Sequence, residues 1–386
     1  MYKDLKSTWV EINLDNLINN FNEVKKILRE DTKVCAVLKA DAYGHGALQI
    51  AKVLEEQGVD YFAVATLQEG LELRNNNIKK PILCLGYINE LSFNLAIKND
   101  ISFTIYKLKS AIKLNKIAKE IDKKARVHIK IDTGMSRLGF SIDDNLIENI
   151  KIINDLDNIY LEGIYTHFPK ADEKDKDITL KQYQRYKKII DLLENKNIKI
   201  PIKHVSNSAT LIDLKDLNLD MVRPGILLYG HYPSNDVNKS NLNILPVMTL
   251  KTTVSMFKRV RKGQGISYGF KYYAKKDTNI ATVSIGYADG FTRMLSGKID
   301  VKINNKSYKQ VGNICMDQCM IDLEDDEIKI GDEVIIFDDS KEFSIQRISN
   351  ALNTIDYEIL CMISRRVPRF YIQDKKILHK LDYLIE

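Results

Sequence analysis

Short apolar runs recur through the first part of the chain, with amphipathic stretches between them. Eight such runs precede residue 230: residues 34–38, 61–66, 82–86, 102–106, 126–132, 160–167, 203–206 and 220–222. Apolar side chains between the runs follow helical spacing, as in Leu14, Leu17, Ile18, Phe21, Val24 and Leu28, and later in Tyr183, Tyr186, Ile190 and Leu193. Because helices join parallel strands, the pattern predicts an α/β fold.

Eight strand–helix units within the first 230 residues favour a (β/α)8 TIM barrel. Periodicity alone leaves an open, doubly wound sheet as an alternative. The barrel leads to a specific prediction: catalytic and binding residues should lie at the C-terminal ends of the strands.

After about residue 240 the chain becomes rich in β-strand patterns. These cover residues 247–260, 279–285, 301–303, 315–323 and 333–337, with turn clusters such as residues 262–265 between them. We therefore expect a barrel over residues 1–240 and a β-rich domain over residues 241–386. The first dozen or so residues could pack on the second domain, and the polar loop 231–243 is the candidate linker.

Composition narrows the class of protein. The 386 residues are 44% hydrophobic and 28% charged, with no apolar stretch near the roughly 18 residues of a membrane helix. The start has no apolar signal core, so a cytoplasmic location is expected. Five cysteines without a C-x-x-C pair predict reduced thiols and no metal site. The net charge of +6 is spread over mixed charges, which argues against nucleic-acid binding.

Lys39 is the first candidate for chemistry. It follows the buried run 34–38 and opens the octapeptide KADAYGHG, residues 39–46. A desolvated lysine loses proton affinity and can condense with a carbonyl, which is how proteins attach pyridoxal phosphate. The alternative is structural, because most lysines at strand ends simply point into water.

Other polar residues follow later strands of the predicted barrel. They are Arg137 after the fifth, His167 at the end of the sixth, Asn207 and Ser208 after the seventh, and Arg223 and Gly225 after the eighth. Each alone fits an ordinary turn, but their joint placement weakens that interpretation. In a barrel, a phosphate would sit by the last two loops, where the Ser208 hydroxyl and the N–H groups of Gly225 and Ile226 can donate.

Six motifs in order give the chain a close resemblance to bacterial alanine racemase, a fold-type III pyridoxal phosphate enzyme. They are KADAYGHG (39–46), DTGMSRLG (132–139), RPGI (223–226), SYG (267–269), IGYADG (285–290) and CMDQ (315–318). The resemblance spans nearly the whole chain. It implies PLP-dependent interconversion of L-alanine and D-alanine, which supplies D-alanine for peptidoglycan.

The resemblance implies a two-base mechanism in which Lys39 carries the cofactor and acts as one base, and Tyr268 is the other. A proton must leave one face of the substrate α-carbon and arrive on the other. Since tyrosine has a reference pKa of about 10, cationic neighbours must assist it. By resemblance, His167 lies next to Tyr268 and Arg223.

The cofactor residues implied by the resemblance are Lys39, Tyr43, His167, Asn207, Ser208, Arg223, Gly225, Ile226 and Tyr357. Arg223 would face the pyridine nitrogen and, because guanidinium keeps its protons, leave that nitrogen unprotonated. We hypothesise that this restrains transamination. The hypothesis predicts that Arg223→Glu raises transamination, and no increase in that variant would contradict it. Related barrel decarboxylases place an acid there.

For the substrate, the resemblance implies that Arg137 binds the carboxylate, assisted by Met316 and Asp317. Lys130 matches a lysine that is carbamylated in some members, which would help to position Arg137. The entry corridor would be lined by Asp172, Tyr287 and Arg293, with Tyr268 and Tyr357 narrowing its inner end. Members are homodimers in which the β-rich domain completes the partner's barrel site.

Two departures and two alternatives accompany the resemblance. Asn313 stands where the family usually has arginine, and Ser284 stands where proline is frequent. A serine racemase or one of broad specificity would keep every motif, and only comparative kcat/KM values would separate it. A non-enzymatic PLP-binding barrel is the other alternative, but it would need neither a second domain nor Tyr268.

Overall fold

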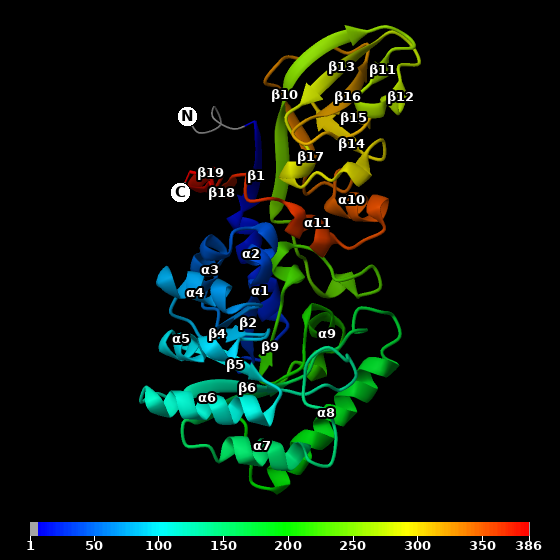
Figure 1. Ribbon diagram of the computed structural model, residues 1–386. Helices are drawn as coiled ribbons and strands as arrows, with labels where there is room; N and C mark the ends of the chain where they lie inside the picture. The colour runs from blue at the N-terminus through cyan, green and yellow to red at the C-terminus, as the bar shows by residue number, and fades with distance from the viewer. Residues whose placement is uncertain (1–6, 386) are drawn as a thin grey trace. The chain divides into compact units, whose positions relative to one another are not determined.

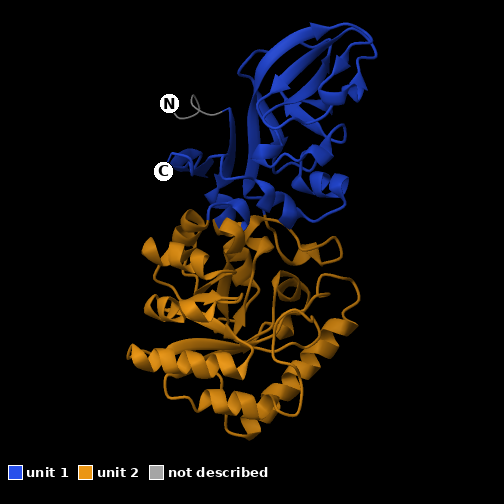
Figure 2. Cartoon of the chain, in the orientation of Figure 1, with its two compact units in different colours: residues 1–17, 43–46, 245–386 blue, residues 18–42, 47–244 orange. Residues whose placement is uncertain are grey.

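The computed structural model describes residues 7–385, which form two compact units coloured separately in Figure 2. Unit 1 contains residues 7–17, 43–46 and 245–385, and unit 2 contains residues 18–42 and 47–244. Residues 1–6, which belong to the start of the chain from which the absence of an export signal was inferred, lie outside the described residues.

Unit 2 is built around eight parallel strands in the order β8-β7-β6-β5-β4-β3-β2-β9. Backbone bonds from Asp220 N to Lys203 O (3.1 Å) and from Arg223 N to Ser206 O (3.0 Å) join the last two strands and close the ring. The barrel prediction is therefore confirmed, and the open sheet is excluded. The strands are β2 (Lys33–Val37), β3 (Tyr61–Val64), β4 (Ile82–Cys84), β5 (Ile101–Ile105), β6 (Ala125–Lys130), β7 (Ile159–Tyr165), β8 (Ile202–His204) and β9 (Met221–Val222).

Helices lie outside this ring of strands (Figure 1). They are α3 (Ala47–Glu56), α4 (Leu67–Asn75), α5 (Phe93–Lys98), α6 (Leu108–Glu120), α7 (Leu146–Asn154), α8 (Asp177–Asn195) and α9 (Ser208–Asp213). The predicted apolar stripe of α8 is real, because Tyr186, Ile190 and Leu193 are buried against the barrel side. Helix α1 (Leu14–Lys26) also forms as predicted, although Leu28 lies just beyond its end.

Unit 1 has a nine-stranded sheet in the order β13-β16-β15-β14-β17-β10-β1-β18-β19, which confirms a β-rich second domain. Strand β10 also pairs with β13, so six of the strands close on themselves. The strands are β1 (Thr8–Asn13), β10 (Met248–Val260), β13 (Thr278–Val283), β14 (Asp300–Ile303), β15 (Lys306–Val311), β16 (Cys319–Glu324), β17 (Glu333–Phe337), β18 (Arg369–Gln373) and β19 (Lys376–Leu381).

Strand β10 organises unit 1 because its buried and part-exposed residues alternate, as a strand with one covered face requires. It pairs with β1 from the start of the chain, and β1 in turn pairs with β18. A short β11–β12 ribbon (Gly265–Ile266 and Tyr272–Tyr273) and helices α10 (Ile345–Leu352) and α11 (Asp356–Met362) complete the unit. Residues 315–318, predicted as strand, form a turn closed by Cys315 N and Gln318 O at 2.9 Å.

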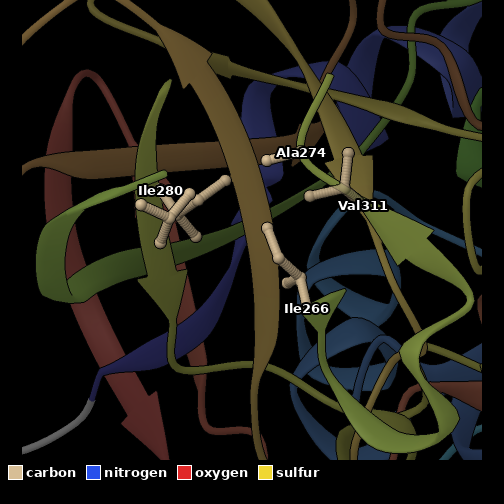
Figure 3. Packing of buried hydrophobic residues seen from close by; sticks show 5 residues of the cluster. Ile266, Ala274, Ile280 and Val311 are labelled. Atoms are coloured by element: carbon tan, nitrogen blue, oxygen red, sulfur yellow. The ribbon is translucent and has the colours of Figure 1, made fainter. Parts of the chain in front are cut away.

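A small apolar cluster supports the β11–β12 ribbon, whose two strands flank Tyr268. It contains Val260, Ile266, Ala274, Ile280 and Val311, each of them buried (Figure 3). Since Ile266 lies in this cluster, the segment that follows it starts from a fixed position.

Within residues 7–385, no helix is long and apolar enough to cross a membrane. All five cysteines are free, as expected.

Candidate active site

Lys39 follows strand β2 and begins α2 (Lys39–Gly44), a turn that is wound in the left-handed sense. Residues 40–43 all have φ between +52° and +55°, although none is glycine. Left-handed winding costs about 1–2 kcal/mol per L-residue, or roughly 4–8 kcal/mol for the four. The surroundings must therefore enforce the turn, and the Lys39 side chain is exposed where it starts.

Several bonds hold the barrel side of this turn. Ala42 N donates to Leu38 O at 2.8 Å, and Ala47 N donates to the Asp41 carboxylate at 2.8 Å. Glu69 accepts from Ala40 N at 2.7 Å, and its other oxygen accepts from Ala65 N at 2.7 Å. Glu69 also forms a capping box with Thr66 at the start of α4. The same carboxylate thus fixes a helix end and the backbone next to Lys39.

Residues 43–46, which continue the turn, belong to unit 1 by their contacts. The buried Arg369 donates to Gly44 O at 3.1 Å, and the Tyr371 hydroxyl donates to His45 O at 2.9 Å. Both glycines of the motif need their small size. An added Cβ would lie 2.5 Å from Leu360 O at position 44 and 1.9 Å from the Tyr371 hydroxyl at position 46.

Tyr43 and Tyr357, both predicted cofactor residues, lie together in unit 1. Their ring centroids are 5.8 Å apart, with the planes tilted by 49°. Burial raises the pKa of Tyr43, so its hydroxyl stays protonated and can donate.

Arg223 is a buried guanidinium just after strand β9. It donates to the Nδ1 atom of His204 at 2.8 Å, to Thr166 O at 2.9 Å and to Val205 O at 3.1 Å. Its plane also lies 5.2 Å over the ring of Tyr165. Among residues 7–385, no carboxylate forms an ion pair with it, so its charge is available to a ligand.

The loops after strands β8 and β9 meet at Ser208 and Gly225. Gly225 N donates to the buried Ser208 hydroxyl at 3.0 Å, and Ile226 follows at once in a short 3-10 turn. The Asn207 side chain caps α9 by accepting from Thr210 N at 3.0 Å and donates to Phe168 O at 3.2 Å. Asn207 therefore shapes the loop that carries Ser208.

The loop that carries Arg137 is folded around Asp132. The Asp132 carboxylate accepts from Gly134 N and Met135 N at 2.9 Å each and from Ser136 N at 3.1 Å. Gly139, at φ +140°, lies so close to the start of the loop that a Cβ would be 2.4 Å from Asp132 N. Arg137 is exposed at the loop tip, as a carboxylate ligand should be.

Cations gather at this end of the barrel. Burial, and then the neighbouring Arg223, lower the pKa of Lys130 to about 7. Burial likewise lowers the pKa of His167 well below its usual value, assisted by the positive charges of Arg223, Lys130, Arg137 and Lys39. His167 is therefore neutral near pH 7. The positive potential comes from the lysine and arginine side chains, and it favours an anionic ligand.

Asp172, predicted to line the entry corridor, is part-buried in the loop after β7, and its backbone carbonyl accepts from the Ser234 hydroxyl at 2.5 Å.

In unit 1, Tyr268 lies in a strained turn between β11 and β12, with its side chain 70% exposed. Ser267 has φ +66° and Phe270 has φ +44°. Asn313 secures this turn, because its side-chain amide donates to Tyr268 O at 2.6 Å and its carbonyl accepts from the Ser267 hydroxyl at 2.6 Å. The residue that departs from the family pattern thus contacts the backbone of Tyr268.

Three more predicted residues converge in unit 1. Tyr287 N donates to Cys315 O at 3.0 Å, and Ala288 N donates to Met316 O at 3.0 Å, which places Tyr287 beside Met316. The next residue, Asp317, accepts from Arg366 at 2.9 Å. Arg293 is exposed in a 3-10 turn, Arg293–Leu295.

Ser284 is the second position that departs from the family pattern, which frequently has proline there. Ser284 N donates to Thr253 O at 3.1 Å, a hydrogen bond that proline could not make.

Each unit therefore assembles its own part of the predicted site. Unit 2 gathers Lys39, Lys130, Arg137, His167, Ser208 and Arg223, and unit 1 gathers Tyr268, Tyr287, Met316 and Asp317. Sequence reasoning missed Glu69, His204 and Asn313 as supporting residues. The signal for Glu69 was its capping-box spacing from Thr66. The signal for His204 was its position within the predicted strand 203–206.

Replacing Asn313 by alanine should lower kcat about five- to tenfold, because the Tyr268 turn loses its side-chain anchor. The free energy of unfolding should fall by about 1 kcal/mol, as for one hydrogen bond. Asn241→Ala is the matched control, since Asn241 makes the same kind of bond to Ile212 O at 3.1 Å. Steady-state kinetics and thermal unfolding of both variants check this. An equal loss of kcat in the two would show that Asn313 has no special role.

Comparison with known proteins identifies the family. The model for the alanine racemase N-terminal domain matches residues 12–233, and that for the C-terminal domain matches residues 247–371. The alanine racemase of Clostridium kluyveri is 46% identical over 388 residues, covering 100% of this chain and 99% of its own.

Solved structures agree with this match. The Clostridium difficile 630 alanine racemase in complex with cycloserine is 50% identical with a TM-score of 0.94, covering 98% of this chain and 99% of its own. The Bacillus anthracis alanine racemase with bound L-Ala-P is 35% identical with a TM-score of 0.93, covering 98% of each chain.

The full-length match to alanine racemases places the chain in the racemase class of isomerases, and its barrel and β-rich unit agree with that class. Within that class, the chain belongs to the alanine racemase family.

Proposed function

We propose that this chain is an alanine racemase that interconverts L-alanine and D-alanine with pyridoxal 5'-phosphate, using Lys39 and Tyr268 as its two bases. The full-length relatives with that name support the activity. The observation that carries the proposal is the set of cations around His167 at the C-terminal end of the barrel, which suits a phosphate and a substrate carboxylate. The product D-alanine would serve peptidoglycan synthesis.

The residues present fit the proposed cofactor. Ser208 and Gly225 offer a hydroxyl and a closely approachable backbone, and Ile226 would add its N–H to the phosphate site. Tyr43 and Tyr357 would contribute two hydroxyl groups. Arg223 uses three N–H donors on described residues, so two of its five remain for the ring nitrogen. Asn207 and the neutral His167 would act by shaping and lining the site.

When bound, the cofactor withdraws electrons from the substrate α-carbon, and the protein controls where the proton goes. Racemisation requires a proton to leave one face and return on the other, so a lysine amine and a tyrosine hydroxyl on opposite faces would serve. Arg137 would hold the substrate carboxylate through its planar guanidinium.

Specificity for alanine would come from a narrow entrance. Tyr287 and Met316 lie side by side in unit 1, with Asp317 next in sequence, and they would line the corridor together with Asp172 and Arg293. The test is a direct assay of racemisation with L- and D-alanine, with L-serine as the competing substrate. We expect kcat/KM to favour alanine over serine by at least about tenfold, because the serine hydroxyl would be one additional polar group in a small pocket. Equal values for serine would favour the broad-specificity alternative, and no racemisation of either would refute the proposal.

Lys130 is proposed to be carbamylated. With a pKa of about 7, about half of the amine is neutral at pH 7, and only the neutral amine adds CO2. The added carboxylate would turn the repulsion between Lys130 and Arg137 into attraction and steady Arg137. In 13C-labelled bicarbonate, a protein carbamate signal should grow between pH 6 and 8 in the 13C NMR spectrum. It should vanish in Lys130→Gln and persist in the exposed control Lys181→Gln; a signal that survives in Lys130→Gln would exclude this site.

We also propose that the active protein is a homodimer in which each β-rich unit completes the partner's barrel site. Unit 1 exposes the proposed base Tyr268 (70%) together with three large apolar side chains, Phe270, Tyr273 and Met316, which are 56%, 57% and 53% exposed. Symmetric pairing would cover them. Dilution below the dimer dissociation constant should therefore reduce turnover in proportion to the monomer fraction, which sedimentation velocity measures. Full activity of a proven monomer would contradict the idea.

A further inference from the structure

A continuous row of buried polar side chains runs from Arg223 into the interior of the barrel. The Arg223 guanidinium bonds His204 Nδ1 at 2.8 Å, His204 Nε2 bonds His128 Nδ1 at 2.9 Å, and His128 Nε2 lies 3.3 Å from the Glu162 carboxylate. The two histidines are fully buried, Glu162 is 1% exposed and Arg223 is 4% exposed. Three neighbouring strands carry these side chains, with His128 on β6, Glu162 on β7 and His204 on β8.

The donors and acceptors of this row can be arranged in only one way. Arginine can only donate, so His204 Nδ1 must be the acceptor. The proton of His204 then resides on Nε2 and is donated to His128 Nδ1, which must also accept. His128 consequently carries its proton on Nε2 and donates to Glu162. Every bond points from Arg223 toward Glu162, and burial lowers the pKa of both histidines, which keeps them neutral.

The far end of the row is a firmly held anion. Glu162 accepts from the Tyr61 hydroxyl at 2.5 Å, from the Ser102 hydroxyl at 3.0 Å and from Arg126 Nε at 3.2 Å. Burial alone would raise the pKa of Glu162, but the bonds from His128 and Arg126 outweigh it and lower the pKa. The carboxylate is therefore ionised, and its charge polarises both imidazoles in the same sense.

Local backbone features place these groups in the barrel interior. In the pairing of β6 with β7, Val127 opposes Leu161 and His128 opposes Gly163, so Glu162 is the extra residue of a bulge. A bulge redirects a side chain, which here is a carboxylate turned into the barrel. Gly163 makes room for the histidine, because a Cβ there would lie 2.2 Å from His128 Nδ1.

We propose that Glu162 and His128 are positioning residues which, through His204, hold Arg223 in the orientation that meets the cofactor ring nitrogen. The inference rests on the proposed function of the site. Arg223 has no carboxylate of its own among residues 7–385, and an adjacent one would engage its N–H groups in pairs. The negative charge of Glu162 reaches Arg223 only through the two imidazoles. It therefore engages one N–H of the guanidinium, the one donated to His204, and leaves other N–H groups for the ligand.

The first test is 15N NMR of the wild-type protein labelled at histidine, which has only six such residues. We expect pyrrole-type Nε2 and pyridine-type Nδ1 signals for both His204 and His128, identified by their absence in single variants. A proton on Nδ1 of His204 would overturn the proposal, whatever the catalytic activity. Racemisation of alanine by the same preparation tests the proposed function separately.

The second test uses Glu162→Gln, which keeps the shape of the side chain and removes its charge. We expect the His204 and His128 nitrogen signals to shift, and the apoprotein's affinity for pyridoxal phosphate to fall about tenfold in fluorescence titration. We also expect kcat to fall about tenfold with an unchanged KM for alanine, because Arg223 does not bind the substrate. Unchanged nitrogen signals and cofactor affinity in a folded Glu162→Gln protein would overturn the proposal.

Glu194→Gln provides the matched control, since Glu194 lies on the outer helix α8 with its side chain 49% exposed. It should leave the histidine signals, cofactor affinity and kcat unchanged. If Glu162→Gln does not fold, Tyr61→Phe removes a single bond to the same carboxylate. It should shift the same histidine signals in the same direction by less, and no shift there would count equally against the relay.

Discussion

Lys39→Ala is expected to abolish racemisation, with a loss of at least about 10³-fold in kcat, because the variant lacks both one of the two bases and the amine that would carry the cofactor. The visible absorbance of the cofactor-bound protein should disappear as well. The fold should be unaffected, because Lys39 is exposed and surface substitutions usually change stability by no more than about 0.5 kcal/mol. Absorbance spectra with L- and D-alanine, a racemase assay and thermal unfolding measure the three effects.

Lys33→Ala is the natural control for this variant. Lys33 is an exposed lysine at the opposite end of the same strand, β2, and should be dispensable for catalysis because barrel chemistry sits at the C-terminal strand ends. Borohydride reduction of the wild-type protein, followed by proteolysis and mass spectrometry, should place the cofactor on a peptide that contains Lys39. If Lys39→Ala keeps the absorbance band or the activity, the central assignment is wrong.

Tyr268→Phe should eliminate racemisation almost as completely, by about 10²–10⁴-fold, since it removes the acid/base group proposed for one face of the substrate. The remaining base, Lys39, should still act on its own face. In D2O, one alanine enantiomer should therefore exchange its α-proton for deuterium without being inverted, while the other should exchange far more slowly. Mass spectrometry combined with chiral chromatography separates exchange from inversion.

Tyr273→Phe tests whether this effect belongs to Tyr268. Tyr273 lies five residues later on β12, with its side chain 57% exposed compared with 70% for Tyr268. Loss of its hydroxyl should leave both racemisation and exchange at wild-type rates. Equal exchange of both enantiomers in Tyr268→Phe would show that another residue serves as the second base.

The sequence pattern was sufficient for the barrel because each of its strands is buried on both faces. Continuous runs of buried side chains such as residues 34–37 and 61–64 have no polar alternation, as expected for strands that are covered by helices on the outside. The β-rich unit was equally visible through the alternation of β10. The prediction was wrong for residues 315–318, where a local turn replaces the expected start of β16.

The left-handed turn after Lys39 shows where sequence reasoning stops. Residues 40–43 are two alanines, an aspartate and a tyrosine; of these only aspartate adopts positive φ at all readily, and then as a single residue and not four in a row. The conformation is imposed by groups far along the chain, which include Glu69 on the barrel side and Arg369 and Tyr371 in unit 1. Only folding brings these groups to the motif, so no local pattern could reveal the strain.

The sequence by itself determined the two-part architecture, the placement of Lys39, Arg137, His167 and Arg223 at the ends of four barrel strands, and, through its motifs, the family. Those features are local or periodic, and a single chain displays them. The tertiary structure alone decided the protonation and support of the site. His167 is neutral because burial and several cations act on it together, and Arg223 is anchored through His204 because three strands meet in the barrel interior. Such effects depend on distances between residues remote in sequence, which only the closed barrel defines.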